Sequence, residues 1–370
     1  MLATLVVAAL PAGASARRAP RGFYGVTWDH NLNLRPQAVQ DRQWDLMAAS
    51  GVESARVSFS WASLQPTRGP IDFAVTDRLV ERAARRRIQL LPVIFEAPSW
   101  AELDQTRRNS PPRRMRDFAG FVQALVGRYG RRGSFWAARP DVPRRPVRFW
   151  QIWNEPDLRF YWNVPRDWSA AWPRGYVRLL KAARSAIRSR DRAGKLVLGG
   201  LSARPWVQLK RLYRLHARPL FDVVAVHPYN SGLRSALEVV RIVRGVMRRR
   251  GDARKALWVT ELGWPAARGR VKLTRGLRRL VTTDHGMARR IRTGYNAFLS
   301  RRRNSRYGVS RVYWFTWASS YQGGEGGIWN YAGLLRTQPL DFVRTPALGA
   351  YRASARRNQG CRKTITGRCR

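Results

Sequence analysis

The segment VRFWQIWNEP, residues 147–156, is an apolar run that changes to polar residues at its end. A second segment, LWVTELGW at residues 257–264, has the same form. Nearly continuous β-branched and aromatic residues are typical of strands that are covered on both faces, as in a parallel sheet. Each of the two expected strands ends with a glutamate, Glu155 in the first and Glu261 in the second.

Outward from these segments, short apolar runs alternate with longer Arg/Ala/Leu segments of helical period, which is the pattern of repeated βα units. The eight expected strands are Gly22–Trp28, Ser54–Trp61, Ile88–Phe95, Val147–Trp153, Lys195–Leu201, Asp222–His227, Leu257–Glu261 and Arg311–Trp317. The expected helices are Gln37–Ala49, Ala74–Arg86, Arg114–Tyr129, Trp168–Arg190, Val207–His216, Leu233–Arg249, Gly276–Arg301 and a last one near Pro346–Ala355.

Eight strands, each followed by a helix, predict an α/β protein with one domain, a (β/α)₈ TIM barrel over residues 22–357. A doubly wound open sheet is the alternative fold. It would need a glycine-rich phosphate turn after the first strand, where this chain has Trp28-Asp29-His30-Asn31. The barrel is therefore favoured.

The ends of the chain predict export. The chain has 370 residues, of which 44% are hydrophobic, yet it has no apolar run long enough to span a bilayer, so stable membrane insertion is not expected. A short apolar stretch before Ala14-Ser15-Ala16 fits a signal peptide over residues 1–16, which predicts a secreted, extracellular protein. Cys361 and Cys369, in a basic tail at residues 358–370, are then expected to form a local disulfide.

The charge balance raises a nucleic-acid hypothesis, because 70 Lys and Arg residues face only 23 Asp and Glu residues, a net charge of +47. The basic residues, mostly arginines, fall on the exteriors of expected helices rather than around one groove-reading motif, as at Arg85–Arg87, Arg248–Arg250 and Arg301–Arg303. A solvated basic shell is the better interpretation. We expect weak, salt-sensitive attraction to anionic polymers and no specific nucleic-acid partner.

The two strand-end glutamates are the candidate catalytic residues. Active sites of such barrels form at the carboxyl ends of the strands, where Glu155 and Glu261 would face each other across the mouth. Cleavage of a glycosidic bond needs such a pair: one carboxylic acid protonates the leaving oxygen, and one carboxylate attacks the sugar or activates water. Pairing of either glutamate with an arginine is the structural alternative in so basic a chain.

Asn154-Glu155-Pro156 and Thr260-Glu261-Leu262-Gly263-Trp264 resemble the motifs of glycoside hydrolase clan A, the retaining TIM-barrel glycosidases that include cellulase-like and β-xylosidase-like families. Similar stretches are Ala55–Trp61, His227-Pro228-Tyr229 and Tyr313–Trp317, so that the resemblance spans residues 22–345. The third strand departs from it. That strand ends Phe95-Glu96, where many cellulase-like members carry a histidine, and Glu96 is a third carboxylate near the mouth.

The resemblance implies that Glu155 is the acid/base, that Glu261 is the nucleophile and that Asn154 contacts the sugar 2-hydroxyl. Four further residues are expected to support them: Arg56 to keep Glu261 ionised, Tyr229 to orient Glu261, His227 to hydrogen-bond substrate or the carboxylates, and Trp314 to form the floor of a sugar subsite. Sugar contact and core packing remain equally good interpretations of Trp28, Trp61, Trp100, Trp153, Trp162, Trp264, Trp317 and Trp329.

The sequence thus predicts a secreted retaining hydrolase that cleaves O-glycosidic bonds, β-linked by the resemblance, in an oligosaccharide or polysaccharide. No metal or other cofactor is expected, because the four histidines have no paired spacing. The alternative is a polysaccharide- or cell-wall-binding barrel that has lost turnover. Transglycosylation would use the same two glutamates.

Overall fold

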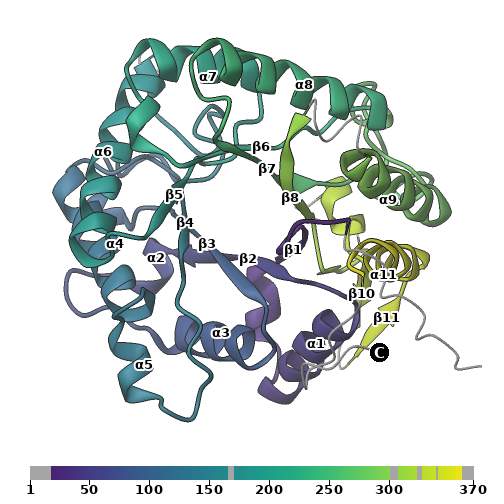
Figure 1. Ribbon diagram of the computed structural model, residues 1–370, viewed down its shortest axis with the longest axis horizontal. Helices are drawn as coiled ribbons and strands as arrows, with labels where there is room; N and C mark the ends of the chain where they lie inside the picture. Colours follow the sequence, from purple (N-terminus) through teal and green to yellow (C-terminus); the bar gives the residue numbers. More distant parts are fainter. Residues whose placement is uncertain (1–17, 166–170, 301–306, 323–326, 339–340, 361–370) are drawn as a thin grey trace, which may run out of the picture.

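The computed structural model describes residues 18–165, 171–300, 307–322, 327–338 and 341–360. The expected signal peptide and the pair Cys361 and Cys369 lie outside these residues. Eight parallel strands form a closed barrel in chain order, with β1 paired to β8 (Figure 1). The strands are β1 Tyr24–Trp28, β2 Ser54–Ser60, β3 Gln89–Phe95, β4 Phe149–Ile152, β5 Lys195–Val197, β6 Val223–Val226, β7 Ala256–Leu262 and β8 Val309–Trp314. The (β/α)₈ prediction is confirmed.

Helices surround the barrel on its outer side (Figure 1). Their bounds are α1 Gln37–Ala49, α2 Trp61–Leu64, α3 Ala74–Arg85, α4 Met115–Tyr129, α5 Ser134–Ala138, α6 Trp172–Arg190, α7 Pro205–Arg214, α8 Leu233–Arg249, α9 Asp284–Leu299 and α11 Pro346–Asn358. In α8 the buried residues Val240, Val243 and Met247 recur at helical spacing and face the sheet side of the helix. Within the described residues, no helix is both long and apolar enough to cross a membrane.

One expected helix begins later than the sequence pattern indicated. We expected it over Gly276–Arg301, but α9 begins at Asp284. The hydroxyl of Thr283 accepts a hydrogen bond from the Gly286 amide at 3.1 Å and so satisfies an otherwise unpaired amide of the first turn. The capping residue, rather than the periodicity, sets this end of the helix.

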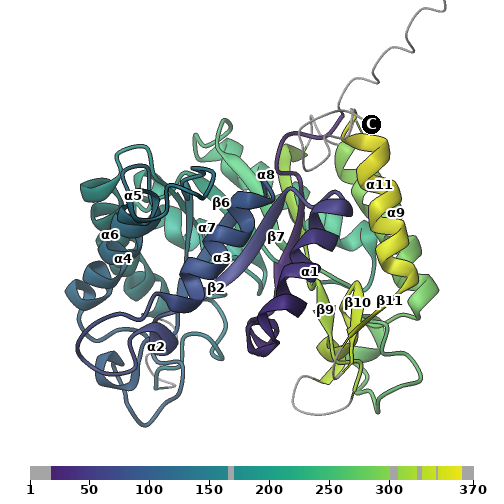
Figure 2. The same ribbon diagram turned by 90° about the horizontal axis from the view of Figure 1, so that it is seen from below.

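A small three-stranded sheet follows the barrel strands and was not expected. Its order is β11-β10-β9, with β9 Ala318–Ser319, β10 Leu335–Thr337 and β11 Phe342–Arg344. Figure 2 shows this sheet and α2 at the same end of the barrel. Because α2 follows β2 and β9 follows β8, this is the end at which the strands terminate, where active sites of such barrels form.

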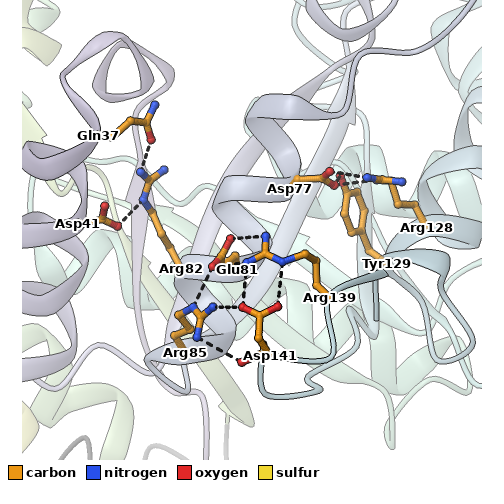
Figure 3. Close-up of polar contacts among 10 residues, drawn as sticks. All are labelled: Gln37, Asp41, Asp77, Glu81, Arg82, Arg85, Arg128, Tyr129, Arg139 and Asp141. Carbon is orange, nitrogen blue, oxygen red and sulfur yellow. Dashed lines mark hydrogen bonds and ion pairs between the residues drawn. The ribbon is translucent and has the colours of Figure 1, made fainter. Parts of the chain in front are cut away.

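Many surface arginines pair with acidic residues of neighbouring elements, as Figure 3 shows around α3. Arg82 of α3 donates to Asp41 of α1 at 2.8 Å, and Arg139 donates to Glu81 of α3 at 2.8 Å. The Arg82 side chain is buried, whereas the pair of Arg139 and Glu81 is partly exposed. Partly exposed pairs contribute about 0–1 kcal/mol each, so they fix the relative positions of the outer elements more than they stabilise the fold. These arginines join neighbouring structural elements.

Candidate active site

The two glutamates singled out in the sequence lie together at the carboxyl ends of the strands. Glu261 lies in β7, Glu155 follows β4 and His227 follows β6. One carboxylate oxygen of each glutamate and one ring nitrogen of His227 all lie within 4.8 Å of one another. All three side chains are buried.

The backbone after β4 is bent to aim Asn154 and Glu155 into the barrel mouth. Trp153 and Glu155 have φ angles of 67° and 38°, a left-handed region that residues other than glycine rarely occupy. The Glu155 amide donates to the carbonyl of Gly199 at 2.6 Å. A Cβ atom on Gly199 would lie only 2.9 Å from the carbonyl oxygens of Ile152 and Trp153, so the turn needs glycine at that position.

Glu261 receives one hydrogen bond on each carboxylate oxygen. Arg56 Nη1 donates to its Oε1 at 2.7 Å, and the Tyr229 hydroxyl donates to its Oε2 at 2.8 Å. Arg56 therefore points into the mouth, and both residues make the expected contact with Glu261. A buried, charge-assisted pair of this kind fixes the orientation of the Glu261 carboxylate.

Arg56 also sets the orientation of Asn154. Its Nη2 donates to Asn154 Oδ1 at 2.6 Å. Because a guanidinium can only donate, the amide oxygen of Asn154 must face Arg56, and the amide nitrogen is directed away from it. Asn154 is thus oriented to donate a hydrogen bond to a ligand hydroxyl.

Glu155 has a different environment from Glu261. Burial raises the pKa of Glu155 to about 7, while a hydrogen bond with Ser202 and the charge of Arg56 act in the opposite direction. A carboxyl group with such a pKa carries its proton at mildly acidic pH and can deliver that proton to a leaving group. The two glutamates therefore differ in their surroundings: burial raises the pKa of Glu155, whereas Glu261 accepts hydrogen bonds from Arg56 and Tyr229.

Asp157, which the sequence analysis did not single out, supports the loop after β5. Its carboxylate accepts from the amides of Ser202 and Ala203 at 3.0 and 2.7 Å. Burial raises the pKa of Asp157 to about 7, and the charge of nearby Glu155 adds to this rise. Asp157 thus holds Ser202 beside Glu155 and is electrostatically coupled to that glutamate.

His227 contacts both carboxylates rather than lying apart from them. Its Nδ1 lies 2.8 Å from Glu155 Oε1 and 3.5 Å from Glu261 Oε2, and its Nε2 lies 3.0 Å from Thr260 Oγ1. Burial lowers the pKa of His227 to about 3, so the ring is neutral at neutral pH. Of the two roles expected for His227, the structure shows the contact with the carboxylates.

Glu155, His227 and Glu261 also have the donor atoms of a metal site, but their surroundings do not favour a cation. Arg56 already places a positive charge 2.7 Å from Glu261, and it would repel a divalent ion bound there. The donor set fits a pair of carboxylates in acid–base chemistry better than it fits metal coordination.

The aromatic floor expected at Trp314 needs correction. Trp314 is 0% exposed, and its indole nitrogen donates to the Ala332 carbonyl at 3.0 Å, so its ring packs in the core. The next residue, Phe315, is partly exposed, as is Trp329. The ring centroid of Trp329 lies 4.6 Å from that of Tyr229, which binds Glu261. Phe315 and Trp329 are therefore the aromatic side chains available to a ligand on this side of Glu261.

A cavity of about 360 Å³ lies against these two rings. Its other lining residues include the polar side chains Asp29, Asn31 and Asn330. Aromatic rings beside a few convergent polar groups are typical of a small-molecule pocket. Of the other tryptophans named above, those buried in the structure are Trp28, Trp61, Trp153, Trp162, Trp264 and Trp317, while Trp100 is partly exposed.

Further residues of the site escaped the sequence analysis. Tyr161, in the loop after β4, has a pKa raised by burial and by the charges of Glu261 and Glu155, so its phenol is electrostatically coupled to both glutamates. Gln151 and Thr260 are fully buried beneath them. A signal was present for the latter two, because a polar residue inside an apolar strand must find a buried hydrogen-bond partner.

Comparison with known proteins gives matches in both sequence and fold. A family model described as beta-galactosidase, of glycoside hydrolase family 42, matches residues 29–101. No curated protein sequence matches the chain. Among solved structures, a family 39 glycoside hydrolase from Bacteroides cellulosilyticus WH2 is similar with a TM-score of 0.69 and 18% identity, over 91% of this chain and 64% of that one.

Two further structures have the same fold. A monomeric beta-xylosidase from Caulobacter crescentus CB15 is similar with a TM-score of 0.63 and 15% identity, over 92% of this chain and 69% of that one. GH5_18 from Streptomyces cattleya, in complex with GlcNAc, gives a TM-score of 0.63 and 19% identity, over 92% of this chain and 81% of that one.

The chain is thus a (β/α)₈ barrel with two carboxylates in contact range at the carboxyl ends of β4 and β7. The match to a glycoside hydrolase family model at residues 29–101 and the barrel fold shared with the similar structures agree with the resemblance to glycoside hydrolase clan A. The family model covers residues 29–101, a stretch that contains neither Glu155 nor Glu261. The chain spans 64% of the length of the family 39 structure.

Proposed function

We propose that the protein is a retaining glycoside hydrolase that cleaves β-linked O-glycosidic bonds by double displacement. The observation that carries the proposal is the short distance between an oxygen of Glu155 and an oxygen of Glu261, which lie within 4.8 Å of one another. Retaining enzymes hold their two carboxyl groups about 5–5.5 Å apart, while inverting enzymes leave about 6.5–9.5 Å for a water molecule. The separation here favours retention.

The environments of the two glutamates support distinct roles. In the first step, Glu155 gives its proton to the glycosidic oxygen while Glu261 forms a bond to the anomeric carbon, and the bond between that carbon and the leaving oxygen breaks. In the second step, Glu155 takes a proton from water, the water oxygen bonds to the anomeric carbon, and Glu261 leaves as a carboxylate. The pKa of Glu155, raised to about 7 by burial, suits a group that carries a proton in one step and accepts one in the next.

Two neighbouring groups would stabilise the oxocarbenium-like charge that develops in the transition state. Asn154, oriented by Arg56, would donate to the sugar 2-hydroxyl through its amide nitrogen, a contact that strengthens as the transition state forms. Phe315 and Trp329, of which Trp329 packs beside Tyr229, would contact the flat C–H face of a sugar ring.

The stereochemistry of the product tests this proposal. A panel of aryl β-xylosides and β-galactosides, chosen from the sugars in the names of the similar proteins, would first identify a substrate. With that substrate, proton NMR should show the β-anomer of the released sugar first and the α-anomer only later, by mutarotation. An α-anomer that appears first would exclude the retaining mechanism, because it requires a single displacement.

We also propose that the protein is exported. The support is the short apolar stretch that ends in Ala14-Ser15-Ala16 at the start of the chain. Expression of the full sequence in a secreting host should yield protein in the medium whose N-terminal sequence begins at Arg17. Intact protein that keeps Met1 and stays in the cells would contradict export.

A further inference from the structure

A chain of buried hydrogen bonds runs beneath the two glutamates from Arg56 to His227. Its inner members, Gln151 of β4 and Thr260 of β7, are each 0% exposed. Neither side chain contacts the cavity, and neither has a role in the double displacement described above. They lie between Arg56, a fixed cation, and His227, which contacts both carboxylates. This position determines which group donates and which accepts in each hydrogen bond.

The first donor in this series of hydrogen bonds is Arg56, whose guanidinium can only donate. Its Nε lies 2.7 Å from Gln151 Oε1, so the amide oxygen of Gln151 must face Arg56. The amide nitrogen of Gln151 then faces the other way. It donates to the Leu198 carbonyl at 2.9 Å and to Thr260 Oγ1 at 3.3 Å.

Thr260 connects Gln151 to His227 by hydrogen bonds. Its hydroxyl oxygen accepts from Gln151, so its own proton is available for His227 Nε2, which lies 3.0 Å away. A neutral imidazole carries one proton, and the nitrogen that accepts a hydrogen bond is the one without it. Nε2 is then the acceptor, and the ring proton is on Nδ1, 2.8 Å from Glu155 Oε1.

The space around His227 keeps the ring in this place. Gly200, in the loop after β5 with a φ of 69°, lies against the imidazole, and a Cβ atom there would be 2.2 Å from His227 Nε2. The ionisable groups that face His227 are Glu155 after β4, Glu261 of β7, Arg56 of β2 and Tyr229.

We propose that Gln151 and Thr260 are positioning residues that fix the proton of His227 on Nδ1, where it is donated to Oε1 of Glu155. The inference rests on the proposed function and adds two consequences to it. When Glu155 is protonated, its acidic proton is directed to Oε2, the oxygen that His227 does not occupy. When Glu155 is ionised, after it has protonated the leaving group, the Nδ1–H bond stabilises its carboxylate.

The tautomer can be observed directly. The chain has four histidines, so ¹⁵N-histidine labelling gives a simple two-bond ¹H–¹⁵N spectrum, and a His227→Gln variant assigns the signals of His227. In the unmodified protein we expect His227 to be neutral between about pH 5 and pH 8, with the tautomer that has its proton on Nδ1 as the dominant form. A His227 signal with the proton on Nε2 would overturn the inference, even in an active enzyme.

The kinetic test removes one hydroxyl. Thr260→Val keeps the shape of the side chain but removes the group that faces Nε2, and it should lower kcat roughly tenfold with little change in KM. Thr260→Ser restores the hydroxyl and should recover most of that loss, which a purely structural role would not require. Thr76→Val, a buried change at α3 that also removes a hydrogen-bonded hydroxyl, is the matched control and should keep kcat.

If Thr260→Val keeps kcat within about twofold of the unmodified enzyme, the positioning role is wrong. The NMR experiment needs no turnover and also applies if Thr260→Val does not fold. A protein that hydrolyses no glycoside would therefore contradict the proposed function, whereas the Nε2 tautomer would contradict only the role of Gln151 and Thr260.

Discussion

Replacement of Glu261 by glutamine should abolish hydrolysis, with a fall in kcat on the order of 10⁴-fold or more. Glutamine has the shape of glutamate, but it cannot form the glycosyl ester, and it removes the negative charge that Arg56 and Tyr229 hold in place. Steady-state rates on the best aryl β-glycoside of the panel would measure the loss. Glu238→Gln, an exposed change in α8, is the matched control and should leave kcat unchanged.

The covalent intermediate gives a second readout of the same prediction. A 2-deoxy-2-fluoro glycoside slows breakdown of the glycosyl–enzyme, so that mass spectrometry of digested protein should find the sugar on the peptide that contains Glu261. The label should be absent in Glu261→Gln. Hydrolysis that persists in this variant at more than about 1% of the original kcat would remove Glu261 from the role of nucleophile. If the unmodified protein binds sugars without any turnover, the binding-barrel alternative holds.

The barrel could be predicted because its signal is repeated along the whole chain. Each strand has an apolar run, and each helix has apolar residues at helical spacing. An error at one position therefore does not change the number of predicted strands and helices. The ends of the strands and helices could be predicted less accurately. The expected strand Lys195–Leu201 ends at Val197 in the structure, because Gly199 and Gly200 leave the regular sheet to make room for the turn after β4 and for His227. Such an end depends on contacts between strands that are far apart in the sequence.

The proximity of Glu155 and Glu261 could be predicted for a similar reason. Glu155 and Glu261 are charged residues that close apolar strands, and closure of the barrel brings the ends of β4 and β7 to the same mouth. The aromatic floor could not be assigned in this way. Tyr313–Trp317 is aromatic at almost every position, so the alternation of side chains cannot say which ring faces the mouth. Only the fold shows that Trp314 is buried and that Phe315 is partly exposed.

The sequence also contained signals that we did not use. Gln151 and Thr260 interrupt apolar strands, which is costly unless each finds a partner. Their partners lie on other strands, Arg56 on β2 and His227 after β6. The absence of a specific nucleic-acid partner, inferred from the scattered arginines, stays a prediction. The ion pairs around α3 are consistent with it, because they use arginines to join neighbouring elements of the fold.

Glu155→Gln should lower activity by an amount that depends on the leaving group. For an oligosaccharide, whose leaving oxygen needs a proton, we expect kcat/KM to fall on the order of 10³-fold. For an aryl glycoside with an acidic phenol, the first step needs little protonation and should be far less affected. The second step still lacks its base, so the glycosyl–enzyme should accumulate and be seen as a burst of released phenol.

The pH dependence identifies the same residue. Burial raises the pKa of Glu155 to about 7, so the group is protonated below pH 7 and loses its proton above it. Because the first step needs the protonated form, kcat/KM on an oligosaccharide should fall about tenfold per pH unit above that value. In Glu155→Gln this alkaline limb should disappear. In Asp157→Asn it should remain and move to lower pH, because a neighbouring negative charge that opposes ionisation of Glu155 is removed.

Azide separates the roles of the two glutamates. In Glu155→Ala, azide needs no general base and can enter beside the shortened side chain, so it should attack the glycosyl–enzyme and give a β-glycosyl azide with faster turnover. In Glu261→Ala, azide would replace the nucleophile itself and give the α-glycosyl azide from a β-glycoside. The opposite pair of products would mean that the assignments of acid/base and nucleophile are exchanged, although it is Glu261 that Arg56 and Tyr229 hold by hydrogen bonds.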